Sequence, residues 1–60
     1  MANYAADTVY SEHDSPTAAG DGLETLLEAT DTTLLIRYAA VIRLHSHSYL
    51  AILTTSDATV

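Results

Sequence analysis

Histidine and carboxylate side chains could bind a metal ion, and two of the three histidines of this chain lie close together. His45 and His47 are separated by one residue, so on a strand their side chains would point to the same side. Imidazole nitrogen binds zinc, copper and nickel. A zinc site takes about three or four ligands, and His13 is distant in sequence. A metal-binding module using His45, His47 and His13 is therefore an alternative function, beside the simpler interpretation of polar residues in an exposed turn.

Serine, histidine and aspartate, which many hydrolases use for catalysis, are present but do not occur in a recognised catalytic motif. The sequence has no nucleophile elbow, no phosphate-binding glycine loop and no metalloprotease motif. Glu24 and Glu28 lie one helical turn apart, and a solvated acidic helix face accounts for them. A chain of 60 residues also has little volume to enclose a substrate. We therefore expect no enzymatic activity, no catalytic residue and no cofactor.

Charge is distributed unevenly along the chain. The formal net charge is −6 at pH 7, and Arg37 and Arg43 are the only lysine or arginine residues. Nucleic-acid binding depends on basic side chains that neutralise phosphates, and anionic membranes attract the same side chains. Neither nucleic acid nor membrane is expected as a partner.

The short chain forms one small domain, residues 1–60. A domain of this size buries only about 60% of the surface that its unfolded chain exposes. It has no cysteine, so no disulfide can add stability. Small domains without disulfides compensate for their small buried surface by binding a metal or by associating with other chains.

The first half of the chain predicts a strand or loose arm followed by a helix. Residues 1–11 show a weak alternation typical of a strand, and a loose N-terminal arm is equally compatible. Ser15 suits an N-cap and Pro16 the first helical position, which predicts a helix over residues 16–30. A later start at Gly22 stays open, because glycine costs helix stability.

The second half predicts a β-hairpin over residues 34–55, followed by a tail over residues 56–60. The apolar stretch from Leu34 to Leu53 is long enough for a membrane span, but its two arginines make that interpretation costly. A turn centred on Ser46 and His47 gives strand pairs that are apolar on both sides: Leu44 with Tyr49, Ile42 with Ala51 and Ala40 with Leu53. The prediction is an α+β fold, with one helix packed on a small antiparallel sheet in (β)αββ order.

In that pairing the helix covers one face of the sheet and leaves the other uncovered. The covered face would carry Leu34, Ile36, Tyr38, Ala40, Ile42 and Leu44. The uncovered face is the predicted interface, made of Leu35, Arg37, Ala39, Val41, Arg43, Leu50 and Ile52. A contiguous apolar patch often marks an interaction surface, whereas single exposed apolar residues are ordinary. The arginines could pair with Glu24, Glu28 or Asp31 of a neighbouring subunit and set its register.

Together these features predict a small, acidic, non-enzymatic structural or interaction protein. It would act by self-association as a homo-oligomer or by docking to a larger protein partner. We expect a cytoplasmic location. A phage- or prophage-encoded accessory protein, located in the virion or the host cell, fits the same description.

Overall fold

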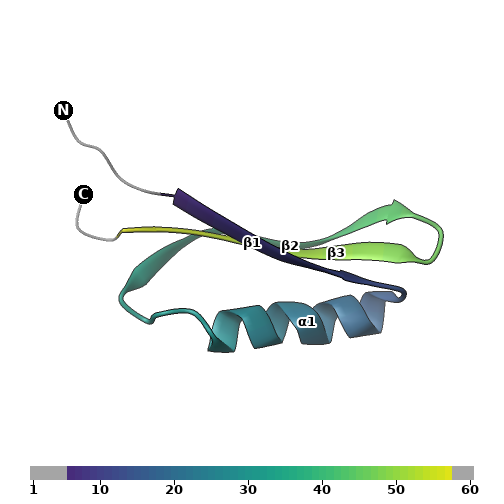
Figure 1. Ribbon diagram of the computed structural model, residues 1–60, viewed down its shortest axis with the longest axis horizontal. Coiled ribbons are helices and arrows are strands. Elements are labelled where there is room, and N and C mark those ends of the chain that lie inside the picture. Colours follow the sequence, from purple (N-terminus) through teal and green to yellow (C-terminus); the bar gives the residue numbers. More distant parts are fainter. Residues whose placement is uncertain (1–5, 58–60) are drawn as a thin grey trace.

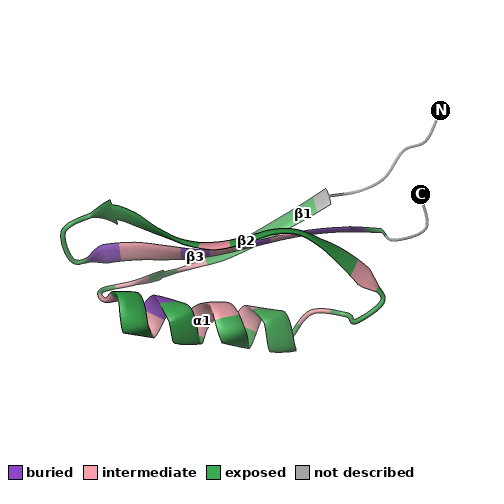
Figure 2. Ribbon diagram, turned by 180° about the vertical axis from the view of Figure 1, so that it is seen from behind, coloured by how far each residue is buried: buried purple, intermediate pink, exposed green. Residues whose placement is uncertain are grey.

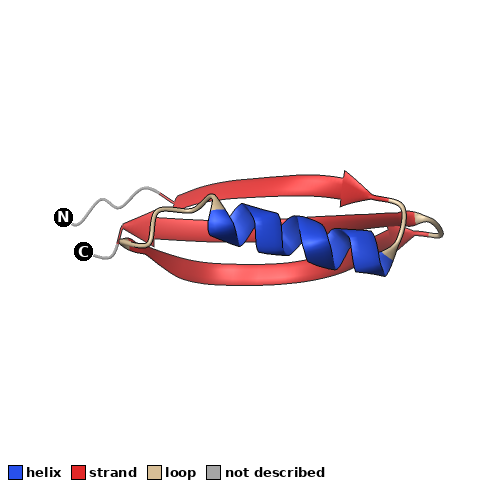
Figure 3. Ribbon diagram, turned by 90° about the horizontal axis from the view of Figure 1, so that it is seen from below, coloured by secondary structure: helices blue, strands red, loops and turns tan. Residues whose placement is uncertain are grey.

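A computed structural model describes residues 6–57. Its elements follow the order β1 (Ala6–His13), α1 (Pro16–Glu28), β2 (Leu34–His45) and β3 (Ser48–Asp57). The strands form one antiparallel sheet in the order β1-β3-β2, so β3 lies in the middle (Figure 3). α1 lies across one face of the sheet, and no other described element covers the opposite face (Figure 1). The predicted α+β class and (β)αββ order are confirmed.

The N-terminal segment contributes an edge strand to the sheet. β1 pairs with β3 along its whole length, from Ala6 opposite Ser56 to His13 opposite Tyr49. This ladder pairs the backbone N–H and C=O groups of β1 that point toward β3, although alanine and aspartate are poor strand formers. The sequence is compatible with a strand or a loose arm over residues 1–11, and residues 6–11 form a strand. Residues 1–5 lie outside the described residues.

α1 begins where the capping residues indicate. Ser15 has an extended backbone, and its Oγ accepts a hydrogen bond from the N–H of Ala18 at 3.1 Å. Pro16 follows at the first helical position, where its missing N–H costs nothing. The later start at Gly22 is not observed. The helix ends at Glu28, before the predicted end at residue 30.

The hairpin turn lies at Ser46 and His47, as the sequence indicates, but the predicted pairing of the two strands is wrong. His45 lies opposite Ser48, and the next pair is Arg43 with Tyr49. Leu44 is thus an extra residue in β2, a β-bulge. The bulge shifts the register by one residue, and such a shift turns the side chains of a strand to the opposite face.

The register shift gives the residues of the predicted pairs, apart from the bulged Leu44, a partner one position away from the predicted one. Ile42 lies opposite Leu50, Ala40 opposite Ile52 and Ala39 opposite Leu53. A second irregularity between Ile36 and Tyr38 makes Arg37 another bulged residue.

α1 therefore covers the face that carries Ala39 and Val41, which corrects the prediction that it covers Ala40 and Ile42. Ala51 of β3 is paired with Val41 of β2 on one side and with Ser11 of β1 on the other, so the three residues lie in one row across the sheet. Directly paired residues share a face of the sheet. The side chain of Ser11 lies next to Gly22 of α1, which identifies this face as the helix side.

The hydrophobic core between helix and sheet is small. The fully buried hydrophobic residues of the described chain are Ala19, Ala51 and Leu53. Buried residues are concentrated on β3, and α1 contributes Ala19 (Figure 2). Leu53 is the only large side chain among these three residues, so the helix side of the sheet buries little apolar volume.

The C-terminal strand is longer than predicted. β3 continues to Asp57, and Ser56 is only 1% exposed, whereas the sequence predicts a tail from residue 56. Both neighbouring strands pair with this part of β3. Residues 58–60 lie outside the described residues.

The apolar stretch from Leu34 to Leu53 forms two strands instead of one helix. Within residues 6–57, no helix combines the length and apolar character that a bilayer crossing requires.

Candidate functional site

The predicted interface residues do not form one surface. Ala39, Val41 and Arg43 lie on the helix side of the sheet, because they pair with the residues of β3 that face α1. The other four, Leu35, Arg37, Leu50 and Ile52, lie on the face turned away from α1. The division follows from the two bulges, which a uniform strand alternation does not include.

The two arginines are placed on opposite faces of the sheet. Nε of Arg37 donates a hydrogen bond to Oγ of Ser56 at 2.8 Å, which draws its side chain to the face away from α1. Arg43 lies opposite Tyr49 on the helix side. One acidic helix of a neighbouring subunit could therefore not meet both arginines on a single face.

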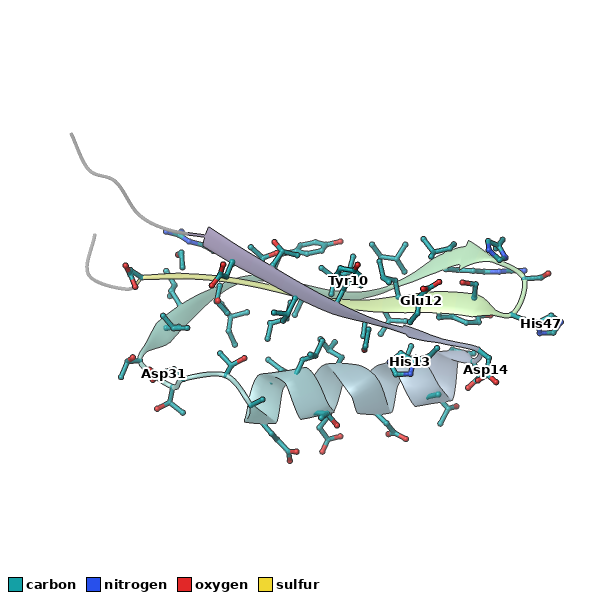
Figure 4. The ribbon with its side chains drawn as sticks, in the orientation of Figure 1. Tyr10, Glu12, His13, Asp14, Asp31 and His47 are labelled. Atoms are coloured by element: carbon teal, nitrogen blue, oxygen red, sulfur yellow. The ribbon has the colours of Figure 1, made fainter. Side chains whose placement is uncertain are left out.

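The face turned away from α1 is the candidate functional site, and we call it the open face. Tyr10 and Glu12 project from it, whereas His13 projects toward the helix (Figure 4). Neighbours paired across the sheet extend the open face. Its residues are Thr8, Tyr10 and Glu12 of β1, Ser48, Leu50, Ile52, Thr54 and Ser56 of β3, and Leu35, Arg37, Tyr38, Ala40 and Ile42 of β2.

Large apolar and aromatic side chains are exposed on the open face. Tyr10 is 67% exposed and Tyr38 50%, with Leu35 at 43% and Ile42 at 36%. Ile52 lies between these side chains on the central strand and is half-buried. The exposed groups lie on β1 and β2, and Ile52 of β3 connects them across the sheet, so they form a continuous patch.

Polar contacts on the open face lie within this patch and at its two ends. Oγ1 of Thr8 and Oγ1 of Thr54 are hydrogen-bonded at 3.0 Å. At the hairpin end of the sheet, Oγ of Ser48 donates to Oε2 of Glu12 at 3.5 Å. Arg37 bonds Ser56 at the other end. The open face therefore has a negative residue at one end and a positive residue at the other.

The structure does not assemble the histidines into a metal site. His13 points toward α1 and His47 lies at the hairpin tip (Figure 4). Nδ1 of His45 donates a hydrogen bond to the backbone oxygen of Ser46 at 3.2 Å. Among the residues that the structure describes, no three histidine, aspartate or glutamate side chains are grouped closely enough to hold a metal ion.

One pair of chemically capable residues was not anticipated from the sequence. Oγ of Ser11 and Nε2 of His13 are hydrogen-bonded at 2.6 Å, and a serine bonded to imidazole is a known way to activate a nucleophile. The spacing of two residues on a strand is the signal that could have identified the pair. Both side chains pack against Gly22 of α1, and the described residues enclose no cavity beside them. We assign the pair to the packing of β1 on α1.

Asp31, one of the acids considered for pairing with an arginine, is engaged in the loop between α1 and β2. Its Oδ1 accepts hydrogen bonds from the N–H of Thr33 at 2.9 Å and from Oγ1 of Thr33 at 2.8 Å. These bonds, the backbone one first, lower the pKa of Asp31 from its ordinary value of 3.8. The carboxylate therefore fixes the loop that leads into β2.

Comparison with known proteins adds no relative. No protein-family model, no curated protein and no solved structure matches the chain.

Proposed function

We propose that this protein is a small, non-enzymatic interaction protein that binds another polypeptide through the open face. The observation that carries the proposal is the exposure of Tyr10 and Tyr38, 67% and 50%, on a face that no described element covers. Contiguous exposed apolar patches mark interaction sites, and tyrosine is enriched among the residues that dominate binding energy. A second copy of the chain and a larger protein are both suitable partners.

The small core supports the same proposal. Only Leu53 contributes a large apolar side chain to the fully buried core of the described residues. Burying one further large side chain stabilises a protein by about 1.5–3 kcal/mol. A partner that covers Tyr38 and Ile42 would therefore stabilise the fold as well as bind it, since anything that binds only the folded state adds to its stability.

We also propose that the chain acts in the cytoplasm or, if a phage encodes it, in the virion or the host cell. The acidic composition, with a formal net charge of −6, supports a protein partner over nucleic acid.

Photo-crosslinking from the open face tests the proposed function. A photoreactive phenylalanine analogue replaces Tyr38 in the full chain, which is expressed in the cells that produce it. The expected result is a covalent adduct with a polypeptide, and Ile42→Glu should abolish it because a charge in the patch opposes burial.

The matched control places the same analogue at Glu24, an exposed residue of α1 that is not part of the open face. Adducts from position 38 that are no more abundant than those from position 24 would refute the proposed function.

A further inference from the structure

We infer that the partner of the open face is a second copy of this chain, packed face to face about a two-fold axis. This inference rests on the proposed function, in which the open face binds protein. It adds the identity of the partner, the symmetry and the two residues that set the register.

The charges of the open face are placed for self-complementarity. Glu12 belongs to β1 and lies opposite Leu50, near the hairpin turn. Arg37 belongs to β2 and bonds Ser56, toward the other end of β3. At about 3.3 Å per residue, Leu50 and Ser56 are roughly 20 Å apart. The two charged residues therefore lie at diagonally opposite corners of one face.

A two-fold axis lying between two such faces brings unlike corners together. If the axis passes near Ile52 and runs perpendicular to the line from Glu12 to Arg37, each glutamate meets the arginine of the other copy. A two-fold interface repeats every contact, so one arrangement forms two opposite-charge contacts. The patch around Ile52, with Tyr10 and Tyr38, then lies in the dry centre.

The size of the patch suits a small dimer. The exposed parts of the apolar and aromatic side chains on the open face amount to roughly 500 Å², given about 150–250 Å² for a whole aromatic side chain. A standard interface buries about 800 Å² per partner. The apolar patch with its polar surroundings therefore approaches the area of a stable interface.

The β2 edge of the sheet is less suited to self-association than the open face. β2 is an edge strand, and it contains bulges at Arg37 and Leu44. Bulges on edge strands interrupt the regular row of N–H and C=O groups that a second chain would need. Face-to-face packing uses side chains and does not need a regular edge.

Charge reversal followed by mixing tests the inference. Glu12→Arg and Arg37→Glu are prepared separately in the full chain, and the dissociation constant for self-association is measured by sedimentation equilibrium at low salt. Each variant places like charges together in its own dimer, so self-association should weaken by about 30-fold or more. An equimolar mixture should associate within about threefold of the unmodified chain, because each copy then supplies the charges that the other needs.

Glu24→Arg is the matched control, since it makes the same charge change on an exposed residue of α1. It should leave the dissociation constant unchanged. At about 1 M salt, where charges are screened within about 3 Å, each single variant should regain part of its self-association.

A second measurement does not depend on the folding of Arg37→Glu. The chain has no cysteine, so Ile52→Cys introduces a single thiol near the proposed axis. A short bismaleimide should link two such copies efficiently, whereas Thr17→Cys on the exposed side of α1 should link poorly.

Three results would overturn the inference: a monomeric unmodified chain at all concentrations, single variants that associate normally, or a mixture that stays dissociated. The photo-crosslinking result distinguishes failure of this inference from failure of the proposed function. A photo-adduct at position 38 with a different, larger protein would preserve the proposed function and exclude the second copy, whereas the absence of any adduct would remove both.

Discussion

The imidazole of His13 occupies the space that a side chain on Gly22 would need. An ideal Cβ on Gly22 would lie 2.6 Å from Cε1 of His13 and 3.0 Å from Oγ of Ser11. These two β1 residues hydrogen-bond to each other beneath the helix. The absence of a side chain at position 22 is thus what lets α1 lie against β1.

Gly22→Ala is expected to destabilise the protein, although alanine normally favours a helix by about 1 kcal/mol over glycine. His13 must move, and its bond to Ser11 is lost, so we expect a net loss of about 1 kcal/mol or more. Gly20→Ala is the matched control, because nothing lies within 4 Å of a Cβ there, and it should stabilise by about 0.5–1 kcal/mol. Urea unfolding measures both.

The same substitution in a His13→Ala background isolates the contact. With the imidazole removed, Gly22→Ala should become neutral or stabilising, as double-mutant cycles show for residues in direct contact. An equal loss in both backgrounds would contradict the packing described.

His47→Gly is expected to stabilise the hairpin. His47 has a φ of 64°, and the left-handed conformation costs a residue with a Cβ roughly 1–2 kcal/mol. We expect the free energy of unfolding to rise by about 0.5–1 kcal/mol, with a smaller gain for His47→Asn. Thermal unfolding with Ser46→Gly as the control checks this. Because His47 is the only described non-glycine residue with positive φ, an equal gain at position 46 would disprove the explanation.

Leu53→Ala is expected to remove much of the stability of the isolated chain. Leu53 is 0% exposed at the centre of β3, and such truncations cost about 2–5 kcal/mol. Ile42→Ala, on the open face, should cost less in the monomer because Ile42 is 36% exposed. Circular dichroism melts of dilute samples compare the two, and similar losses would argue against the assigned faces.

Asp31→Ala is expected to destabilise the protein at neutral pH and to matter less in acid. The pKa of Asp31 is lowered by its bonds from Thr33. A lowered folded-state pKa gives stability that is present above the ordinary value of 3.8 and is lost as pH falls through the folded value. Urea unfolding at pH 7 and near pH 2 should show the gap between the two proteins narrowing. A gap that stays constant would rule out this linkage.

The sequence predicts the class and order of the elements because those depend on local signals. Ser15 and Pro16 mark the helix start, and the apolar alternation after Leu34 marks strands. The pairing of those strands depends on Arg37 and Leu44, each of which adds one residue to β2. Nothing in the types of these two residues distinguishes a bulge from a regular strand position.

The bulge at Leu44, which the sequence does not predict, explains why sequence patterns identify only part of the candidate site. One extra residue at Leu44 exchanges the faces of the β2 segment from Tyr38 to Arg43, so Tyr38 and Ile42 join the open face while Val41 lies on the helix side. Hydrophobic alternation could not reveal the exchange, since both faces of β2 carry apolar residues. The sequence also does not distinguish a strand from a loose arm at β1, because the strand that pairs with β1 lies more than 35 residues away, as Glu12 opposite Leu50 shows.

The central position of β3 also constrains how the chain can fold. β1 and β2 pair only with β3 within the described residues, yet β3 is the last of the three to be synthesised. Until it emerges, β1 has no strand to pair with and α1 no sheet to pack on. Contacts between such distant segments slow folding. In the nascent chain the sheet can therefore form only after β3 has been synthesised.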